Sequence, residues 1–237
     1  MVATVVNALL ILIGSFTGLL FRDKIKQKYL DAVVIGLGLC VGIIGINSAL
    51  SSENTLCVIV CMVAGVVIGE LLRIEDRLNH LGDALKEKFM KGRTNSRFTE
   101  GFMAATLLFG VGSMAILGSL EAGINHNYSI ILSKSVMDGL IAIGFAATMG
   151  VGVALSAVMI FLYQGALTLL AGVVAPLLSD AMIAEMSGVG GIIIIGLAIN
   201  MLGLSGEKPV RTGNMLPAIF LPILYIPLVN WFGGIIK

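Results

Sequence analysis

The composition of this chain of 237 residues indicates an integral membrane protein. Hydrophobic residues make up 57% of it and charged residues only 12%, whereas a soluble domain carries about 25% charged residues. The net charge is +1, which gives no reason to expect binding to nucleic acid. A soluble core of 24.8 kDa with a mean hydropathy of +1.02 could not bury this much apolar surface. A soluble enzyme, a secreted disulfide scaffold and a disordered chain are therefore excluded, and the lipid bilayer is the expected partner.

Apolar segments long enough to cross a bilayer recur along the whole chain. A helix needs about 20 apolar residues to cross a hydrocarbon core of about 30 Å. Segments such as 33–50 and 192–204 are apolar on every side, unlike the alternating strands of a barrel. The sequence predicts an all-α polytopic membrane protein with about eight transmembrane helices; seven with one re-entrant segment is the alternative. The expected spans are 2–21, 32–50, 55–72, 101–120, 130–148, 151–175, 187–205 and 214–236.

One longer polar segment divides the chain after the third expected span. Its apolar residues recur at helical spacing, which predicts an amphipathic helix on the membrane surface; they are Ile74, Leu78, Leu81, Leu85 and Phe89. A polar linker over residues 91–97 follows. We therefore expect a first membrane half at 1–73, the amphipathic helix and linker at 74–97, and a second membrane half at 98–237.

Basic residues gather in the loops that follow the expected spans 2–21, 55–72 and 187–205. The loops between them carry mainly acidic residues. Because Lys and Arg accumulate in cytoplasmic loops, and because eight spans put all three basic loops on one side, we expect both termini to lie outside the cytoplasm.

Two pairs of expected spans align with each other without gaps. The span 32–50 aligns with 187–205, which pairs Gly38 with Gly191 and Asn47 with Asn200. The span 2–21 aligns with 151–175. Since elements five spans apart cross the membrane in opposite directions, one hypothesis is an inverted repeat of the first three and the last three spans, an architecture of secondary transporters. Chance similarity between apolar helices is the alternative.

Several polar side chains fall inside the expected spans, where an ionisable group costs about 2.5–3.5 kcal/mol. Lys134 and Asp138 lie four residues apart on one helix face and can neutralise each other. The pair either fixes a helix near the outer surface or lines a polar path in which Asp138 carries a proton or holds a cation. Glu185 falls near the start of a span, where the helix dipole stabilises it. The other candidates for a substrate or ion path are Gly112, Ser113, Tyr163, Gln164, Asn47 and Asn200.

Glycine and proline predict irregular helices in two of the spans. Small residues crowd the span 101–120, and they favour either close helix packing or a broken helix at 110–113. A break would offer free N–H and C=O groups to a small polar solute near mid-membrane. Pro217, Pro222 and Pro227 predict a kinked or irregular last span.

The residue types that carry catalysis or bind metals are scarce. Cys57 and Cys61 share a helix face, but no His or further Cys accompanies them, which favours packing over a soft metal. His80 and His126 lie outside the spans, and no His-Glu-x-x-His or Gly-x-Ser-x-Gly motif occurs. We expect no enzyme, no catalytic residue, no metal and no cofactor. A phosphate-binding loop is also absent from the sequence, so an ion gradient would drive any transport.

Eight stretches together resemble the domain of unknown function 554 family of bacterial multi-pass membrane proteins. They cover nearly the whole chain and are residues 7–18, 65–70, 98–109, 112–119, 134–139, 163–165, 185–191 and 214–217. The resemblance implies a protein of the bacterial cytoplasmic (inner) membrane and carries over no chemistry. Ser113 departs from the family pattern, which commonly has proline there, so an obligatory proline break is not expected.

The preferred hypothesis is a small secondary transporter or channel-like carrier of a small polar solute or ion, with its site between the fourth and seventh spans. The alternative is a non-transporting membrane scaffold or regulatory partner that binds through residues 74–97. An intramembrane enzyme is the least favoured hypothesis. A homo-oligomer is compatible with each of them.

Overall fold

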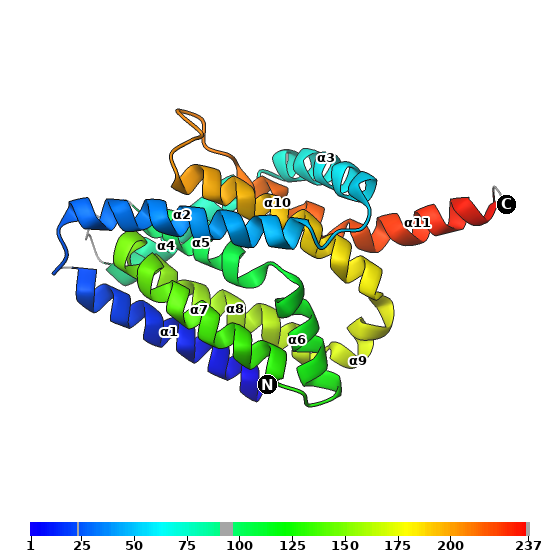
Figure 1. Ribbon diagram of the computed structural model, residues 1–237, viewed down its shortest axis with the longest axis horizontal. Coiled ribbons are helices and arrows are strands. Elements are labelled where there is room, and N and C mark those ends of the chain that lie inside the picture. The colour runs from blue at the N-terminus through cyan, green and yellow to red at the C-terminus, as the bar shows by residue number, and fades with distance from the viewer. Residues whose placement is uncertain (23, 91–96, 236–237) are drawn as a thin grey trace.

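The computed structural model describes residues 1–22, 24–90 and 97–235, and within them the chain is all α-helical with short 3₁₀ segments (Figure 1). This confirms the predicted fold class. The elements are α1 Val2–Arg22, α2 Gln27–Ala49, α3 Thr55–Leu72, α4 Ile74–Met90, α5 Phe98–Gly110, α6 Ser113–Ile124, α7 Ser129–Met149, α8 Gly152–Leu169, α9 Ala171–Val174, η1 Ala175–Leu177, α10 Asp180–Met201, η2 Thr212–Phe220 and α11 Pro222–Ile235.

Within the described residues, six helices are long and apolar enough to cross a membrane: α1, α2, α3, α7, α8 and α10. Two bent pairs raise the number to eight if each pair forms one span. They are α5 with α6, bent by 60°, and η2 with α11, bent by 41°. The eight coincide with the predicted spans but differ at their ends. The helix α10 starts at Asp180, because the Ser179 hydroxyl caps it by accepting the Met182 N–H at 3.2 Å.

Proline accounts for the irregular last span. Pro217 lies inside η2, a 3₁₀ segment, and Pro222 is the first residue of α11. Because proline lacks an N–H, it interrupts the hydrogen bonding of a helix interior but is tolerated in a first turn. The kink predicted from the sequence therefore falls at residue 221.

Long helices pack side by side in pairs. The helix α1 lies along α7 and α2 along α10 (Figure 1). In the same way α3 packs on η2 and α5 on α8. A Cβ atom at Gly14 would lie 2.1 Å from the Gly139 carbonyl oxygen, and one at Gly18 would lie 2.1 Å from the Ile143 oxygen. Glycine is therefore what allows the α1 and α7 backbones to touch.

The division into two membrane halves and the inverted repeat stay predictions. Helices α1 and α2 of the first predicted half pack mainly on α7 and α10 of the second. The aligned helices α2 and α10 also pack on each other, with a Cβ at Gly191 falling 2.6 Å from the Gly45 oxygen. Such a contact suits any two small-residue helices, so it does not test the repeat.

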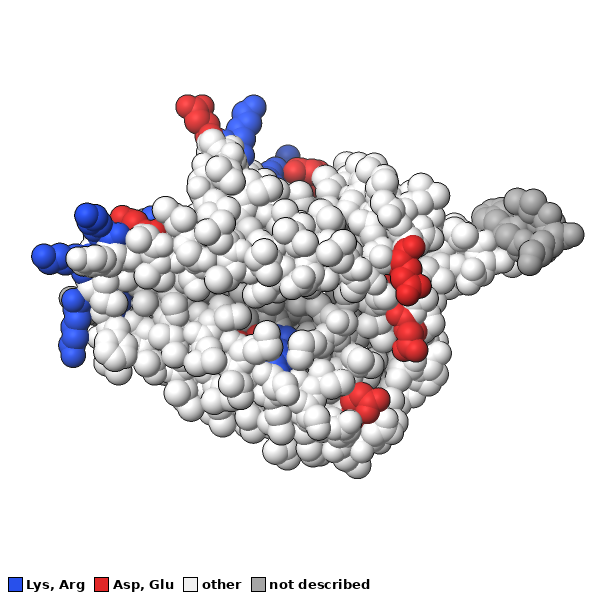
Figure 2. Space-filling model, in the orientation of Figure 1, with Lys and Arg blue, Asp and Glu red and all other residues white. Residues whose placement is uncertain are grey.

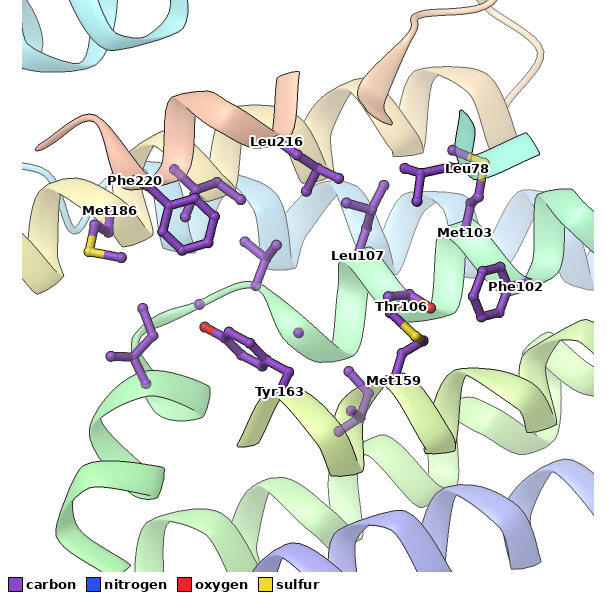
Figure 3. Close-up of a pocket in the computed structure, with 16 residues that line it drawn as sticks. Leu78, Phe102, Met103, Thr106, Leu107, Met159, Tyr163, Met186, Leu216 and Phe220 are labelled. Atoms are coloured by element: carbon purple, nitrogen blue, oxygen red, sulfur yellow. The ribbon is translucent and has the colours of Figure 1, made fainter. Parts of the chain in front are cut away.

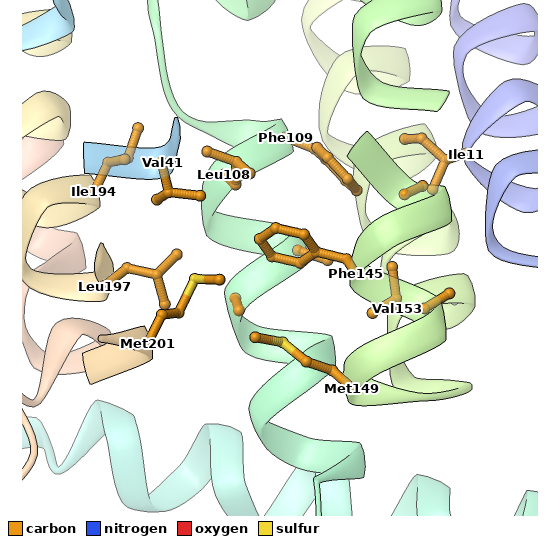
Figure 4. Close-up of a cluster of buried hydrophobic side chains, with 14 of the residues drawn as sticks. Ile11, Val41, Leu108, Phe109, Phe145, Met149, Val153, Ile194, Leu197 and Met201 are labelled. Atoms are coloured by element: carbon orange, nitrogen blue, oxygen red, sulfur yellow. The ribbon is translucent and has the colours of Figure 1, made fainter. Parts of the chain in front are cut away.

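A core of apolar side chains fixes the end of α5 (Figure 4). Phe109 of α5 and Phe145 of α7 are fully buried, and their ring centroids lie 6.4 Å apart. Ile11, Met149 and Ile194 bring α1, α7 and α10 to the same cluster. Because this packing anchors α5 at its last turn, the chain leaves the helix at a defined position.

Charged side chains gather at the two ends of the molecule. In Figure 2, Lys and Arg cluster at one end over the α1–α2 connection, acidic side chains gather toward the opposite end, and the face between is almost uncharged. Arg211, in the α10–η2 loop, binds Glu70 at 2.9 Å and Asp76 at 2.6 Å. The basic loops that follow α3 and α10 therefore meet at one end, as the eight-span count requires. The side of the membrane on which they lie stays a prediction.

The predicted amphipathic helix is present as α4, which begins at once after α3 because Arg73 adopts a left-handed conformation with φ 49°. Leu78 faces α5 and η2, and Asp83 accepts a hydrogen bond from the Thr99 hydroxyl at 3.0 Å. The side chains of Leu81, Leu85 and Phe89, and the linker residues 91–96, lie outside the described residues.

Candidate functional site

The site begins with the break in the fourth span. Helix α5 ends at Gly110 and α6 begins at Ser113, with an extended Val111 and Gly112 between them. Gly112 has φ 121° and ψ 155°, a backbone conformation that is essentially restricted to glycine. Of the two alternatives that the sequence leaves open at 110–113, close packing and a broken helix, the structure shows the broken helix, and Gly112 forms it with serine and not proline at position 113.

Helix α6 begins without a side-chain cap among the described residues. Gly112 occupies the N-cap position, and no side-chain cap bond is formed there among the described residues. The Ala115 N–H turns back to the Gly112 oxygen at 3.1 Å. A helix N-terminus carries a partial positive charge of about half an elementary charge, so this end of α6 favours a negative group.

A cavity of about 220 Å³ lies against this break, and we call it the polar cavity because six polar or charged residues line it beside an otherwise apolar wall. It brings together five of the eight predicted site residues from α2, α6, α7 and the connection between α5 and α6: Asn47, Gly112, Ser113, Lys134 and Asp138. Ser48 and Ser51 also line it and were missed by the sequence reasoning, because serine is common at helix contacts in membranes. Figure 2 shows the face hollowed between α2 and α7, where this cavity lies.

Lys134 and Asp138 form a buried ion pair on one face of α7. The Lys134 Nζ atom lies 2.5 Å from Asp138 Oδ2, and the residues are 6% and 4% exposed. They are the sole charged residues lining the cavity among those that the structure describes. Each charge compensates the other, so removing one partner would leave an unpaired charge in an apolar bundle.

Two buried amides that do not line the polar cavity lie on α1 and α8, and one of them interacts with the ion pair. Asn7 of α1 donates through Nδ2 to Gln164 Oε1 of α8 at 2.9 Å, and Asn7 also interacts with the Asp138 carboxylate. Asn7 Oδ1 and Gln164 Nε2 are buried and find no partner within the described part of the chain. Gln164 therefore binds Asn7, and it does not line the polar cavity.

A second, apolar cavity of about 330 Å³ lies on the other side of the break (Figure 3). Tyr163 belongs to this cavity, and in Figure 3 its hydroxyl points toward the segment between α5 and α6. Phe102, Met159 and Phe220 contribute to the largely hydrocarbon wall. Val111 and Gly112 line both cavities, so two extended residues separate an apolar space from a polar one.

Asn200 lies away from both cavities. Its Nδ2 donates to the Val210 oxygen at 2.8 Å, and its Oδ1 accepts the Val210 N–H at 2.8 Å. The amide therefore holds the loop between α10 and η2, and the structure gives it no contact with the polar cavity.

Glu185 binds the loop before α3. It sits in the second turn of α10, later than the helix start that the sequence predicts for it, because α10 begins at Asp180. Its carboxylate accepts the Ser52 hydroxyl at 2.6 Å and the N–H groups of Glu53 and Asn54, both at 2.9 Å. Through these three hydrogen bonds, the buried Glu185 carboxylate holds the α2–α3 loop, which includes Ser51 of the polar cavity.

A second carboxylate connects α4 to η2 at the basic end. Glu75 Oε2 accepts the Gly213 N–H at 2.8 Å, and the Glu75 N–H donates to Asn214 Oδ1 at 2.7 Å. Burial raises the pKa of the Glu75 carboxyl above its ordinary value, against the opposing effects of the Gly213 N–H and Arg211. This junction joins α4 to η2 and does not line the polar cavity.

The two cysteines predicted to pack are buried side by side. Cys57 and Cys61 have sulfur atoms 3.8 Å apart and belong to a cluster with Ile183 and Val189. The described residues contain no group of three or more His, Cys, Asp or Glu side chains arranged to hold a metal ion.

Comparisons with known proteins place the chain in a family. Residues 2–226 match the model of the "Protein of unknown function (DUF554)" family. The chain is 32% identical to the "Uncharacterized membrane protein YdfK" of Bacillus subtilis (strain 168), covering 98% of this chain and 99% of that protein. It is 25% identical to the "Uncharacterized protein YqgA" of Escherichia coli (strain K12), covering 96% and 97%. No solved structure matches. The chain belongs to the DUF554 family and is a multi-pass membrane protein.

Proposed function

We propose that this DUF554 protein is a secondary transporter or channel-like carrier of a small polar solute or ion, whose path runs through the polar cavity. One observation carries the proposal: a buried charge pair and the free end of a broken helix line the same cavity inside an apolar bundle. Discontinuous helices of this kind form the substrate sites of secondary transporters.

The position of the ion pair favours a path over a simple anchor. A pair that only fixes a helix has no need of a cavity, because the two charges compensate each other without any solvent. Lys134 and Asp138 instead share a space of about 220 Å³ with the hydroxyls of Ser48 and Ser113. Such a space holds several water molecules, so a solute of a few heavy atoms fits there.

The charge distribution supports an orientation for this path. Under the positive-inside rule, the basic end belongs to the cytoplasm, and both termini then lie outside it. Ser51, which lines the cavity, belongs to the α2–α3 loop at the opposite end. We therefore expect a solute to reach the cavity from the outer side of the inner membrane, near Ser51, and an ion gradient to supply the driving force.

A flux experiment tests the proposal. The purified protein is reconstituted in liposomes, and the entry of small ions and neutral solutes is followed under imposed proton, sodium and potassium gradients. We expect flux above that of empty liposomes, and loss or altered coupling of that flux in Asp138→Asn. The matched control is Glu121→Gln, since Glu121 bonds locally to Asn125 outside the cavity. If no solute moves, or if Asp138→Asn behaves as wild type throughout, the transport proposal fails.

A further inference from the structure

We infer that the polar cavity binds a small monovalent anion together with a proton, with Lys134 as the cation that holds the anion and Asp138 as the group that takes the proton. The inference rests on the proposed function and names its substrate class. It follows from the charges that line the cavity and from the end of α6 that faces it.

The fixed charges of the cavity exclude a lone anion. In the structure Lys134 is held by Asp138, so the pair has no net charge. An anion entering this state would approach the Asp138 carboxylate in a confined space inside an apolar bundle, where like charges repel more strongly than in bulk water. Lys134 is available to an anion only after Asp138 has lost its charge.

A proton on Asp138 changes this balance. The protonated carboxyl no longer neutralises Lys134, which then lies unpaired and 6% exposed in an apolar surrounding. An anion supplies the missing negative charge. Proton and anion therefore favour each other's binding, and the loaded site has the same total charge as the empty one. No bond is made or broken other than the O–H bond of Asp138.

The donors around the pair suit an anion better than a cation. Gly112, Ser113 and Met114, the N-cap and first residues of α6, all line the cavity. Their end of the helix carries partial positive charge. A cation would have to displace Lys134 from Asp138 and then meet this positive helix end. A monovalent anion instead meets Lys134 and neutral donors such as the Asn47 amide.

Among the described residues, Lys134 is the charged group that faces Asp138, so protonation of Asp138 changes the charge of this pair and of no other group. The charged group that interacts with Asp138 is Lys134 of the same helix. From α1, the neutral amide of Asn7 also interacts with it. The cavity walls from α2 and α6 contribute neutral side chains, including Asn47 and Ser113. The titratable Tyr163 of α8 lines the apolar cavity across the break, and Glu185 of α10 is bound to the α2–α3 loop.

Proteoliposomes that contain a trapped pH dye test the inference with chloride and nitrate, whose acids are fully ionised. An inward gradient of either anion is imposed with the voltage clamped by potassium and valinomycin. We expect acidification of the lumen at one proton per anion, independent of voltage. Anion uptake by the wild type should rise up to tenfold per unit fall in pH until it saturates.

Variants assign the roles of the two residues. Lys134→Gln should abolish anion uptake and acidification together. Asp138→Asn should abolish acidification and leave anion flux that now follows the voltage, because Lys134 is permanently free. Glu121→Gln should keep the behaviour of wild type. Should Asp138→Asn fail to fold by size-exclusion chromatography, the wild-type proton-to-anion ratio and pH dependence decide alone.

The outcomes separate this inference from the transport proposal. If neutral solutes or cations cross the membrane and neither anion acidifies the lumen, the protein transports but the inference is wrong. Wild-type anion flux that follows voltage without protons also overturns it. If nothing crosses, both fail.

Discussion

Replacement of Gly112 by alanine removes the residue that allows the helix break. At φ 121° and ψ 155°, an L-residue occupies a backbone region that costs about 1–3 kcal/mol. A Cβ atom at Gly112 would meet no atom within 4 Å, so the penalty comes from the backbone alone. For a chain of this size, about 1–3 kcal/mol corresponds to a fall in Tm of roughly 2–12 °C.

Gly110→Ala is the matched control for this measurement. Gly110 is the last residue of α5, and its Cβ would lie 3.5 Å from Ile160 Cδ1, an ordinary contact. Both variants are purified in the same detergent, and their Tm values are taken from thermal unfolding. We expect Gly112→Ala to melt below wild type and Gly110→Ala to melt close to it. Equal Tm values for Gly112→Ala and wild type, or a larger loss in Gly110→Ala, would refute the claim that backbone strain at Gly112 sets the break.

Three further comparisons of Tm test the packing and the polar contacts. Gly14→Ala should lower the Tm because its Cβ would fall on the Gly139 oxygen, whereas Gly36→Ala, which meets nothing within 4 Å, should not; equal effects would argue against the α1–α7 contact. Glu185→Ala leaves the Glu53 and Asn54 N–H groups without their acceptor, at about 1–3 kcal/mol each. Its Tm should therefore fall further than that of Glu185→Gln. The opposite order would contradict the role of Glu185 in holding the α2–α3 loop. The raised pKa of Glu75 means that the folded protein binds this proton more tightly than the unfolded chain does. Its stabilising contribution is therefore complete below about pH 4.5 and is lost as the pH rises through the folded value. The Tm of wild type measured against Glu75→Gln should accordingly fall between pH 4.5 and neutral pH, and a constant or rising difference would contradict the shift.

Much of the architecture follows from local sequence. Apolar segments of about 20 residues have few alternatives to crossing the membrane as helices, so the eight predicted spans correspond to helices or bent pairs. The small residues at 110–113 are compatible with a break, since glycine weakens a helix, or with close helix packing, and the backbone of Gly112 decides for the break. The ends of α10 were harder to place, because Ser179 acts as a cap only through its hydrogen bond to Met182.

Which polar residues line the cavity depends on contacts between segments that are distant in the sequence. Lys134 and Asp138 lie on one face of any helix that contains them, so their pairing was predictable. Gln164 and Asn200 are also amides inside apolar spans, yet they bind Asn7 and Val210 instead of lining the polar cavity. No periodicity distinguishes these roles. Glu185 likewise binds a loop that lies more than 130 residues earlier in the chain.

Access of water to Ser113 tests the central claim most directly. In a Cys40→Ala background, where the remaining Cys57 and Cys61 are buried, Ser113→Cys is exposed in intact proteoliposomes to a charged, membrane-impermeant methanethiosulfonate. Leu140→Cys on the outer surface of α7, which is 65% exposed along an apolar helix, is the lipid-facing control. We predict rapid modification of Ser113→Cys and none of Leu140→Cys. If both thiols remain unmodified while the unfolded proteins react fully, the cavity is closed to water and cannot carry a polar solute.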